Sequence, residues 1–525
     1  MQFVVTPFNN AKTTAPVLLN APNNVTLPNH SNSHLAYDLR WYLERFLDDP
    51  FEPNTSLAEE IQDALMQWGK ETYGKLFQGN IYDWLQETIK LHPRQLIIRI
   101  ASNDARILAW PWETLQDSEG LILSHTCRIE RQLNVLHNPR PLIEKLPTDC
   151  VNVLLVIANP YENQNVRYHA LARPLVELCQ RQSVPIRVDV LRPPTFDQLR
   201  KVLQEKPGFY HVVHFEGYGG YGTGSNDIDI HNDNHKKPWG RLFFETQEGE
   251  IDTIEAAQLA QLINETNIPI AILNICPSTC IDDSVNDPCA TIAATFLKTG
   301  IHSVIAMSYS LHVRAAQLFV SAFYRSLFQL GSVPEALHAG RRAMLVQPQR
   351  FCARGEYPLQ DWLVPVLYQQ QEHHIEFNTI SPSQQATKTV PLPPAAAEYG
   401  DYGFIGRNRT IHKLERLLQQ HAQAGLLIHG KAGIGKTSLA QGFVQWLQHT
   451  DGLGEGVFWF RFDNIRSVED IISQMTAGLL APAFQPLRQN KRLIIYARYS
   501  NNTGLLWCGI TLNPPVALRA RKSQV

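Results

Sequence analysis

The sequence predicts an α/β protein with a mostly parallel sheet flanked by helices, followed by a linker and a truncated second α/β unit. Between residues 149 and 370, strand-like apolar runs alternate with helical patterns, and such alternation is typical of parallel strands joined by helices. The run at residues 151–158, Val-Asn-Val-Leu-Leu-Val-Ile-Ala, is almost wholly apolar, which favours a strand covered on both faces. A Gly-rich phosphate-binding pattern at residues 430–437, with a strand before it and a helix after it, predicts the second unit.

The bulk composition is that of a globular protein, because 44% of the 525 residues are hydrophobic and 18% are charged. The formal net charge of -2 gives no general attraction to nucleic acid or to an anionic membrane, so we expect neither as a partner. No apolar run approaches the roughly 18 residues of a membrane span, and the first residues lack the parts of a signal peptide. The eight cysteines are scattered without metal-ligand spacing, and we expect a cytoplasmic protein with reduced thiols.

Composition divides the chain into six segments. Residues 1–34 are rich in Asn, Pro, Thr and Ser, and we expect a disordered leader there. Residues 35–148 are predicted to form an accessory α/β region, in which residues 107–115 form a strand that leads into a helix. Residues 149–370 are predicted to form the core, and residues 371–400, rich in Gln, Ser, Thr, Pro and Ala, a linker. Residues 401–480 hold the phosphate-binding pattern, and for residues 481–525 we expect an aberrant or unstructured tail.

Two strand-and-turn stretches carry the candidate chemistry of the core. Residues 211–220 read His-Val-Val-His-Phe-Glu-Gly-Tyr-Gly-Gly, a mostly apolar strand that runs into a glycine-rich turn. A second strand begins near residue 268 and ends in Leu-Asn-Ile-Cys-Pro-Ser at residues 273–278. Because the carboxyl ends of parallel strands meet at one edge of a sheet, Cys276 is predicted to lie near the glycine-rich turn. A cysteine nucleophile is plausible chemistry for such an edge.

These stretches resemble the CHAT domain, a caspase-like family of cysteine peptidases whose signatures read roughly His-Phe-x-Gly-His-Gly and Leu-Asn-x-Cys-x-Ser. The resemblance covers about residues 37 to 370 and implies a caspase-like fold, preceded by the accessory region, that acts on or binds proteins or peptides. It also implies that Cys276 is the nucleophile and that backbone N–H groups near Gly219 stabilise the oxyanion. At the position of the family's general base, a histidine, this chain has Tyr218.

The substitution at residue 218 leaves two functions open. A phenol has a pKa of about 10 and cannot act as a base near neutral pH. His214 is an alternative base, but it lies four residues earlier on the strand, and a histidine that faces the core is the simpler interpretation. The residues favour a pseudoprotease, or a degenerate signalling and interaction protein. The alternative is an active cysteine endopeptidase effector regulated by a nucleotide-binding module.

Residues 430–437, Gly-Lys-Ala-Gly-Ile-Gly-Lys-Thr, fit the P-loop pattern in full. The backbone around Gly430, Gly433 and Gly435 would cradle the phosphates of ATP, Lys436 would reach the β- and γ-phosphates, and Thr437 would hold Mg²⁺. The preceding Phe-Ile-Gly-Arg at residues 404–407 resembles the entry signature of the STAND signal-transduction ATPases. That resemblance implies ATP with magnesium as the cofactor, and an oligomer can form through such a module.

A complete ATPase of this kind needs a later strand that ends in Asp, because this acid orders Mg²⁺ and the attacking water. Residues 492–499 are apolar enough for a strand but contain no Asp. We therefore expect a truncated P-loop unit that binds nucleotide without turnover. A shifted reading frame over residues 503–514 would explain the loss of this acid.

Overall fold

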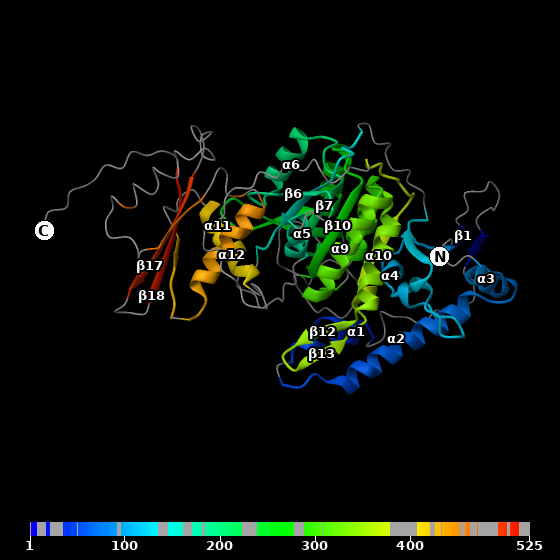
Figure 1. The fold of residues 1–525 in the computed structure, drawn as a ribbon. Coiled ribbons are helices and arrows are strands. Elements are labelled where there is room, and N and C mark those ends of the chain that lie inside the picture. Colours follow the sequence, from blue (N-terminus) through cyan, green and yellow to red (C-terminus); the bar gives the residue numbers. More distant parts are fainter. Residues whose placement is uncertain are drawn as a thin grey trace. The chain divides into compact units, whose positions relative to one another are not determined.

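The computed structural model describes residues 2–7, 17–20, 35–49, 51–91, 96–134, 145–160, 171–180, 184–222, 239–277, 288–307, 309–378, 407–419, 426–431, 433–450, 452, 457–461, 470, 492–500 and 505–513. The chain forms two compact units (Figure 1). The first comprises residues 1–246 and 250–379, and the second comprises residues 247–249 and 380–525.

A sheet of twelve strands organises the first unit. At its centre, β7 (Val212–Gly222) pairs in parallel with β10 (Ile270–Pro277) on one side and with β5 (Val151–Ile157) on the other. Next to β5 lies β6 (Ile186–Val190), and next to β10 lies β11 (Ser303–Met307), both again parallel. The helices between these strands explain the parallel pairing, because a strand needs a long crossover to return in the same direction. The predicted mostly parallel sheet flanked by helices is confirmed.

Further strands widen this parallel centre. Antiparallel to β11 runs β14 (Pro365–Gln369), and β4 (Arg128–Gln132) and β3 (Leu96–Ala101) follow in the sheet order. A hairpin of β8 (Trp239–Glu245) and β9 (Ile251–Glu255) pairs with the far end of β7, beyond the point where β5 stops. The carboxyl end of β7 is therefore enclosed between β8 and β10.

Two segments of the expected disordered leader form strands instead. These are β1 (Gln2–Pro7) and β2 (Val17–Asn20), and β1 pairs antiparallel with both β2 and β3. Their cores, Phe-Val-Val-Thr and Val-Leu-Leu, consist largely of residues that favour strands. The edge of β3, which would otherwise present unpaired backbone groups, is covered by β1, and β2 then forms the outer edge.

Helices cover the sheet of the first unit. They include α1 (Leu35–Glu44), α2 (Thr55–Leu76), α3 (Asn80–Leu91), α4 (Ala105–Leu108), α5 (Ala172–Gln180), α6 (Phe196–Glu205), α7 (Ala256–Glu265), α8 (Pro288–Thr299), α9 (Val313–Leu330) and α10 (Val333–Val346). Short 3-10 turns are η1 (Phe46–Asp48), η3 (Trp112–Thr114), η4 (Leu123–His125) and η5 (Asp361–Leu363), and β12 (Gln349–Cys352) and β13 (Gly355–Pro358) form a separate hairpin.

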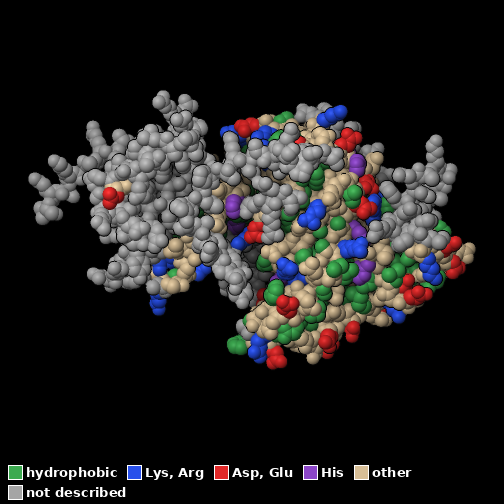
Figure 2. Space-filling model, viewed as in Figure 1, with side chains coloured by type: hydrophobic (Ala, Val, Ile, Leu, Met, Phe, Trp, Pro, Cys, Tyr) green, Lys and Arg blue, Asp and Glu red, His purple; other side chains and the backbone are tan. Residues whose placement is uncertain are grey.

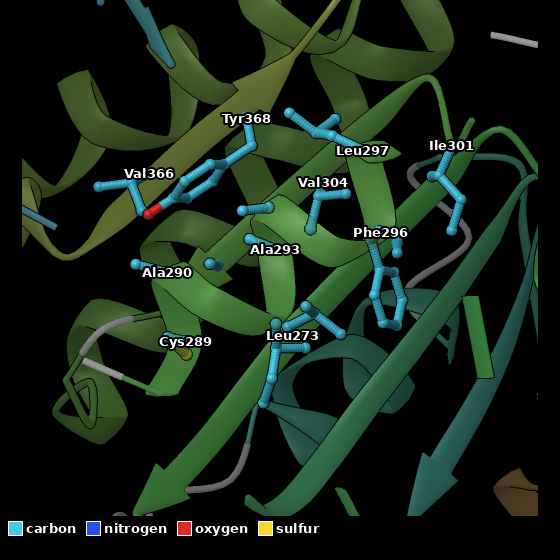
Figure 3. Packing of buried hydrophobic residues seen from close by; sticks show 14 of the residues in the cluster. Leu273, Cys289, Ala290, Ala293, Phe296, Leu297, Ile301, Val304, Val366 and Tyr368 are labelled. Atoms are coloured by element: carbon cyan, nitrogen blue, oxygen red, sulfur yellow. The ribbon is translucent and has the colours of Figure 1, made fainter. Parts of the chain in front are cut away.

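A large hydrophobic core lies on one face of the sheet, because it contains alternate residues of the central strands together with residues of α7 and α8. Helix α8 packs against β10, β11 and β14, and Figure 3 shows Leu273, Phe296 and Val304 among the side chains of this core. Every residue of β5 is buried, which is why its sequence is apolar throughout rather than alternating. None of the described helices is both long and apolar enough to cross a membrane. On the face of the first unit seen in Figure 2, acidic and basic side chains are interspersed.

The stretch at residues 107–115, predicted as a strand that leads into a helix, contains the end of α4 and the turn η3. The predicted strand was wrong because a local cap starts a helix earlier: the Asp104 carboxylate accepts a hydrogen bond from the Arg106 backbone N–H at 2.9 Å. The ring of Trp112 is fully buried, and its Nε1 donates to the Ile107 carbonyl at 2.7 Å. This tryptophan is thus a packing residue of the accessory region.

A buried ionic network joins the accessory region to the core. Arg131 on β4 donates two hydrogen bonds to the Glu113 carboxylate, at 2.6 and 2.7 Å, and Arg341 on α10 donates a third at 2.8 Å. Arg341 also donates to the Pro365 carbonyl at the start of β14. Burial alone would raise the pKa of Glu113, but the two guanidinium groups outweigh it and hold that pKa below its ordinary value.

The first unit continues beyond the predicted start of the linker at residue 371. Ile375 is buried, and its N–H donates to the Gly331 carbonyl at 2.8 Å. The Asn378 N–H donates to the Thr148 carbonyl at 2.7 Å. Residues 371–378 therefore pack on the core, and the rest of the predicted linker lies outside the described residues.

The second unit contains α11 (Asn408–Gln419), β15 (Leu426–Ile428), α12 (Lys436–His449), β16 (Val457–Arg461), β17 (Arg492–Ser500) and β18 (Leu505–Asn513). Its sheet order is β15-β18-β17-β16, with β18 antiparallel to both neighbours. Two segments of the expected tail thus form strands, in keeping with the apolar run at residues 492–499. Whether this tail is aberrant stays a prediction.

Candidate active site

The carboxyl ends of β7 and β10 bring the two predicted site stretches together. In their parallel ladder Cys276 and Tyr218 are Cα partners, and Pro277 and Gly219 are the next pair. Neighbouring strands lie about 4.8 Å apart, so the backbones at residues 218 and 276 are direct neighbours. The prediction that Cys276 lies beside the glycine-rich turn is confirmed at the level of the backbone. Ser278 of the same motif lies outside the described residues.

Tyr218 is a buried residue of this edge. Only 2% of it is exposed, and it is among the largest fully buried side chains of the unit. On its other side it is the Cα partner of Phe243 in β8. The Cα partner of Cys276 on β7 is therefore a phenol that neighbouring strands enclose.

His214 lies on the same strand but away from Cys276. Its Cα partners are Ile272 in β10 and Leu155 in β5, four residues before the register position of Cys276. At a rise of about 3.3 Å per residue, this separation is roughly 13 Å along the strand. The side chain is 1% exposed, and neither ring nitrogen has a hydrogen-bond partner among the described residues. Burial lowers its pKa to about 3, so the ring is neutral.

Close packing gives a structural reason for glycine at residue 219. A Cβ atom added there would lie 2.6 Å from Cγ2 of Ile275 and 3.0 Å from the Arg241 carbonyl oxygen. Any side chain would therefore push β7 away from β8 and β10. This reason stands beside the predicted oxyanion role of Gly219, which depends on its backbone rather than on the missing side chain.

Buried oxygen atoms also gather near this edge, and the sequence reasoning did not single them out. The Glu216 carboxylate, between the positions of His214 and Tyr218, accepts a hydrogen bond from the Ala172 N–H at 2.7 Å. The Glu245 carboxylate accepts one from the Asn159 N–H at 2.7 Å. The sequence does contain a signal for such a buried carboxylate, because Glu216 lies inside a mostly apolar strand. A charged residue at such a position is rarely fully buried unless it has a partner.

The comparison with protein families decides what this edge belongs to. The model of the CHAT domain matches residues 71–385, which is more than half of the chain. The chain belongs to the CHAT-domain family. This family is related to the caspase-like peptidases, and the mostly parallel sheet agrees with that relation. No curated protein matches the chain.

The match ends before residues 430–437, whose sequence predicts a P-loop and which lie in the second unit. There the backbone adopts positive φ at Gly430, Gly433 and Gly435, at 155°, 78° and 88°. Such values favour glycine, and they allow the chain to curl around the amino end of α12. The loop therefore has the backbone freedom that the sequence pattern predicted.

Two P-loop side chains are placed at the start of α12. The Lys436 ammonium group is buried and donates to the carbonyls of Gly430 and Lys431 at 2.8 and 2.7 Å, whereas Thr437 is exposed. Arg407, from the predicted entry signature, donates to the Ile434 carbonyl at 3.3 Å. The contact of Arg407 connects the predicted entry signature with the loop, although the two motifs are separate in the sequence.

The strand beside β15 carries no acid. The neighbour is β18, in which Cys508 is the Cα partner of Ile428. The described strands of this sheet, β15, β16, β17 and β18, contain neither Asp nor Glu. Within this described sheet, nothing replaces the acid that would order magnesium and water.

Proposed function

We propose that this chain is a pseudoprotease of the CHAT-domain family, which binds a protein or peptide partner without cleaving it. The observation that supports this proposal is the register of β7 and β10, in which buried Tyr218 takes the position beside Cys276. The backbone of a cysteine-peptidase site is kept, and the residue that would activate the thiol is replaced.

On this proposal, Cys276 has no general base that could take the proton from its thiol. A free thiol with a pKa of about 8.5 is only a few per cent thiolate at pH 7, and the thiolate is the nucleophile. The phenol of Tyr218 is protonated at that pH and cannot accept the proton. His214 does not replace the base, because its register position is four residues away and its ring is enclosed.

The second candidate function is an active cysteine endopeptidase controlled by nucleotide binding. The retained backbone position of Cys276 favours it, as does the P-loop geometry around Lys436. On this reading a base from outside the described residues would serve Cys276. For either function we propose that the P-loop binds ATP with magnesium through Lys436 and Thr437.

The substitution Tyr218→His tests the proposal. An imidazole beside Cys276 should accept the thiol proton, and such general-base assistance is typically worth about 10²- to 10⁴-fold. We expect no cleavage of a mixed peptide library by the wild-type chain, and measurable cleavage by the variant. Alkylation of Cys276 by iodoacetamide at neutral pH should also be faster in the variant, since a neighbouring imidazolium lowers the pKa of a thiol.

Two controls make the result interpretable. Tyr218→Phe removes the hydroxyl without adding a base and should leave alkylation at the wild-type rate. Cys276→Ala in the Tyr218→His background should abolish any cleavage. Wild-type cleavage that requires Cys276 would refute the pseudoprotease and support the second candidate. An unchanged alkylation rate in a folded Tyr218→His variant would show that the two side chains do not meet.

A further inference from the structure

Two histidine rings lie in contact at the edge of the CHAT domain opposite the candidate site. His302 immediately precedes β11, and His373 follows β14. The antiparallel pairing of Ser303 with Gln369 brings these two chain ends together. The ring centroids are 4.8 Å apart, with an angle of 53° between the ring planes.

This spacing suits two imidazoles that share one metal ion. With metal–nitrogen bonds of about 2.0–2.1 Å, ring centroids lie roughly 4.5 Å apart for a right-angled pair and roughly 5.2 Å apart for a tetrahedral one. The observed 4.8 Å lies between these limits. Contact between the rings is therefore compatible with joint coordination as well as with simple stacking.

The two rings have no competing partner among the described residues. No hydrogen bond or ion pair joins either ring to another described side chain or to the backbone, whereas His211 uses both of its ring nitrogens in hydrogen bonds. His302 is 8% exposed and His373 is half-buried, so solvent reaches the pair mainly at His373. An ion could enter there and keep water on its remaining positions.

We propose that His302 and His373 bind one divalent transition-metal ion of the zinc type. Imidazole nitrogen is a preferred donor for zinc, copper and nickel. The described residues contain no group of three or more His, Cys, Asp and Glu side chains placed to hold a metal. The nearby Glu372 carboxylate is engaged with Ser332 and Arg128. The site therefore offers two protein ligands, and its ion is exchangeable.

A bound ion would fasten the end of the CHAT domain to its sheet. The segment after β14 is held by the Ser332 hydroxyl, which donates to Glu372 at 2.6 Å, and by the Ile375 N–H, which donates to Gly331 at 2.8 Å. A metal bridge from His373 to His302 would add a direct connection to β11. Because the ion binds the folded state, it should raise the melting temperature in proportion to the logarithm of its concentration.

Zinc titration of the purified full chain, after removal of metals with a chelator, tests this proposal. We expect one zinc ion per chain at this site, and hydrogen exchange of the Ile375 amide should slow when zinc is bound. His302→Asn and His373→Asn should each weaken zinc binding by at least about tenfold, a loss of the size that metal-site substitutions commonly cause. The melting temperature of both variants without zinc reports whether they fold.

His374→Asn is the matched control. Its side chain is exposed, and the ring contact of His373 is with His302. Zinc affinity should stay within about twofold of wild type, well below the loss expected for a ligand. Cobalt in place of zinc should lack the intense absorption of thiolate ligation, which excludes the cysteines. Zinc binding that survives in a folded double variant, His302→Asn with His373→Asn, would overturn the proposal, as would the absence of zinc binding in the wild type.

Discussion

Removing the charge of Glu113 should destabilise the CHAT domain more than any exposed ion pair could. Glu113 is 1% exposed, and its two arginine partners are 1% and 5% exposed for Arg131 and Arg341. Glu113→Gln keeps the shape of the side chain but removes the negative charge to which both buried guanidinium groups donate. Loss of one partner of a buried pair typically costs about 3–5 kcal/mol. Because one carboxylate serves two arginines here, we expect a loss in the upper part of that range.

Urea unfolding followed by tryptophan fluorescence measures this loss, through the midpoint of the transition of the first unit. The matched control is Asp197→Asn, which breaks the exposed Arg200–Asp197 pair, whose side chains are 42% and 89% exposed. Exposed pairs contribute about 0.2–1 kcal/mol, so this control should shift the midpoint little. A loss below about 1 kcal/mol for Glu113→Gln would refute the reasoning, since the network would then act as an exposed pair does.

Two further predictions concern pH and nucleotide. Burial lowers the pKa values of His214 and His211 to about 3 and 4, so both rings stay neutral in the folded state. The free energy of unfolding should be highest above about pH 6.5. It should fall as the pH drops toward 4, because the unfolded chain then binds protons that the folded rings do not, and the loss should be about 2 kcal/mol per histidine at pH 5. Equal urea midpoints at pH 7 and pH 5 would contradict this. For the second unit, Lys436→Ala should weaken binding of a fluorescent ATP analogue, whereas the wild type should bind it with negligible turnover. Robust hydrolysis by the purified wild-type chain would show that the site is complete.

The centre of the fold was predictable because its signals are local. The apolar run of β5 and the glycine-rich end of β7 identify parallel strands without knowledge of distant contacts. The accessory region was less accessible to prediction. Its Glu113 lies 228 residues from Arg341, and nothing in either local sequence shows that they meet. The strand β1 likewise forms because the edge of β3 is open, which is a property of the folded sheet.

The candidate site was predictable as far as its two motifs. Their order along the chain indicated that Cys276 would lie near the glycine-rich turn, and the ladder adds that Tyr218 is its direct neighbour. The interpretation that His214 faces the core agrees with its burial, but period-two alternation could not predict that its ring nitrogens lack a hydrogen-bond partner among the described residues. The role of Glu216 could not be predicted either, because it depends on a contact between distant segments. The first N–H of α5 donates to the Glu216 carboxylate, and this carboxylate is buried.

The pairing of residue 218 with residue 276 is made by main-chain groups, and this has a consequence for how the gene can change. The codons of tyrosine and histidine differ only in their first base, where tyrosine has T and histidine has C. A single transition therefore exchanges the two residues, while the ladder between β7 and β10 holds the position in place. On our proposal, one point mutation separates the inactive site, with tyrosine at residue 218, from an active site with histidine there. Neither form requires a change of the fold.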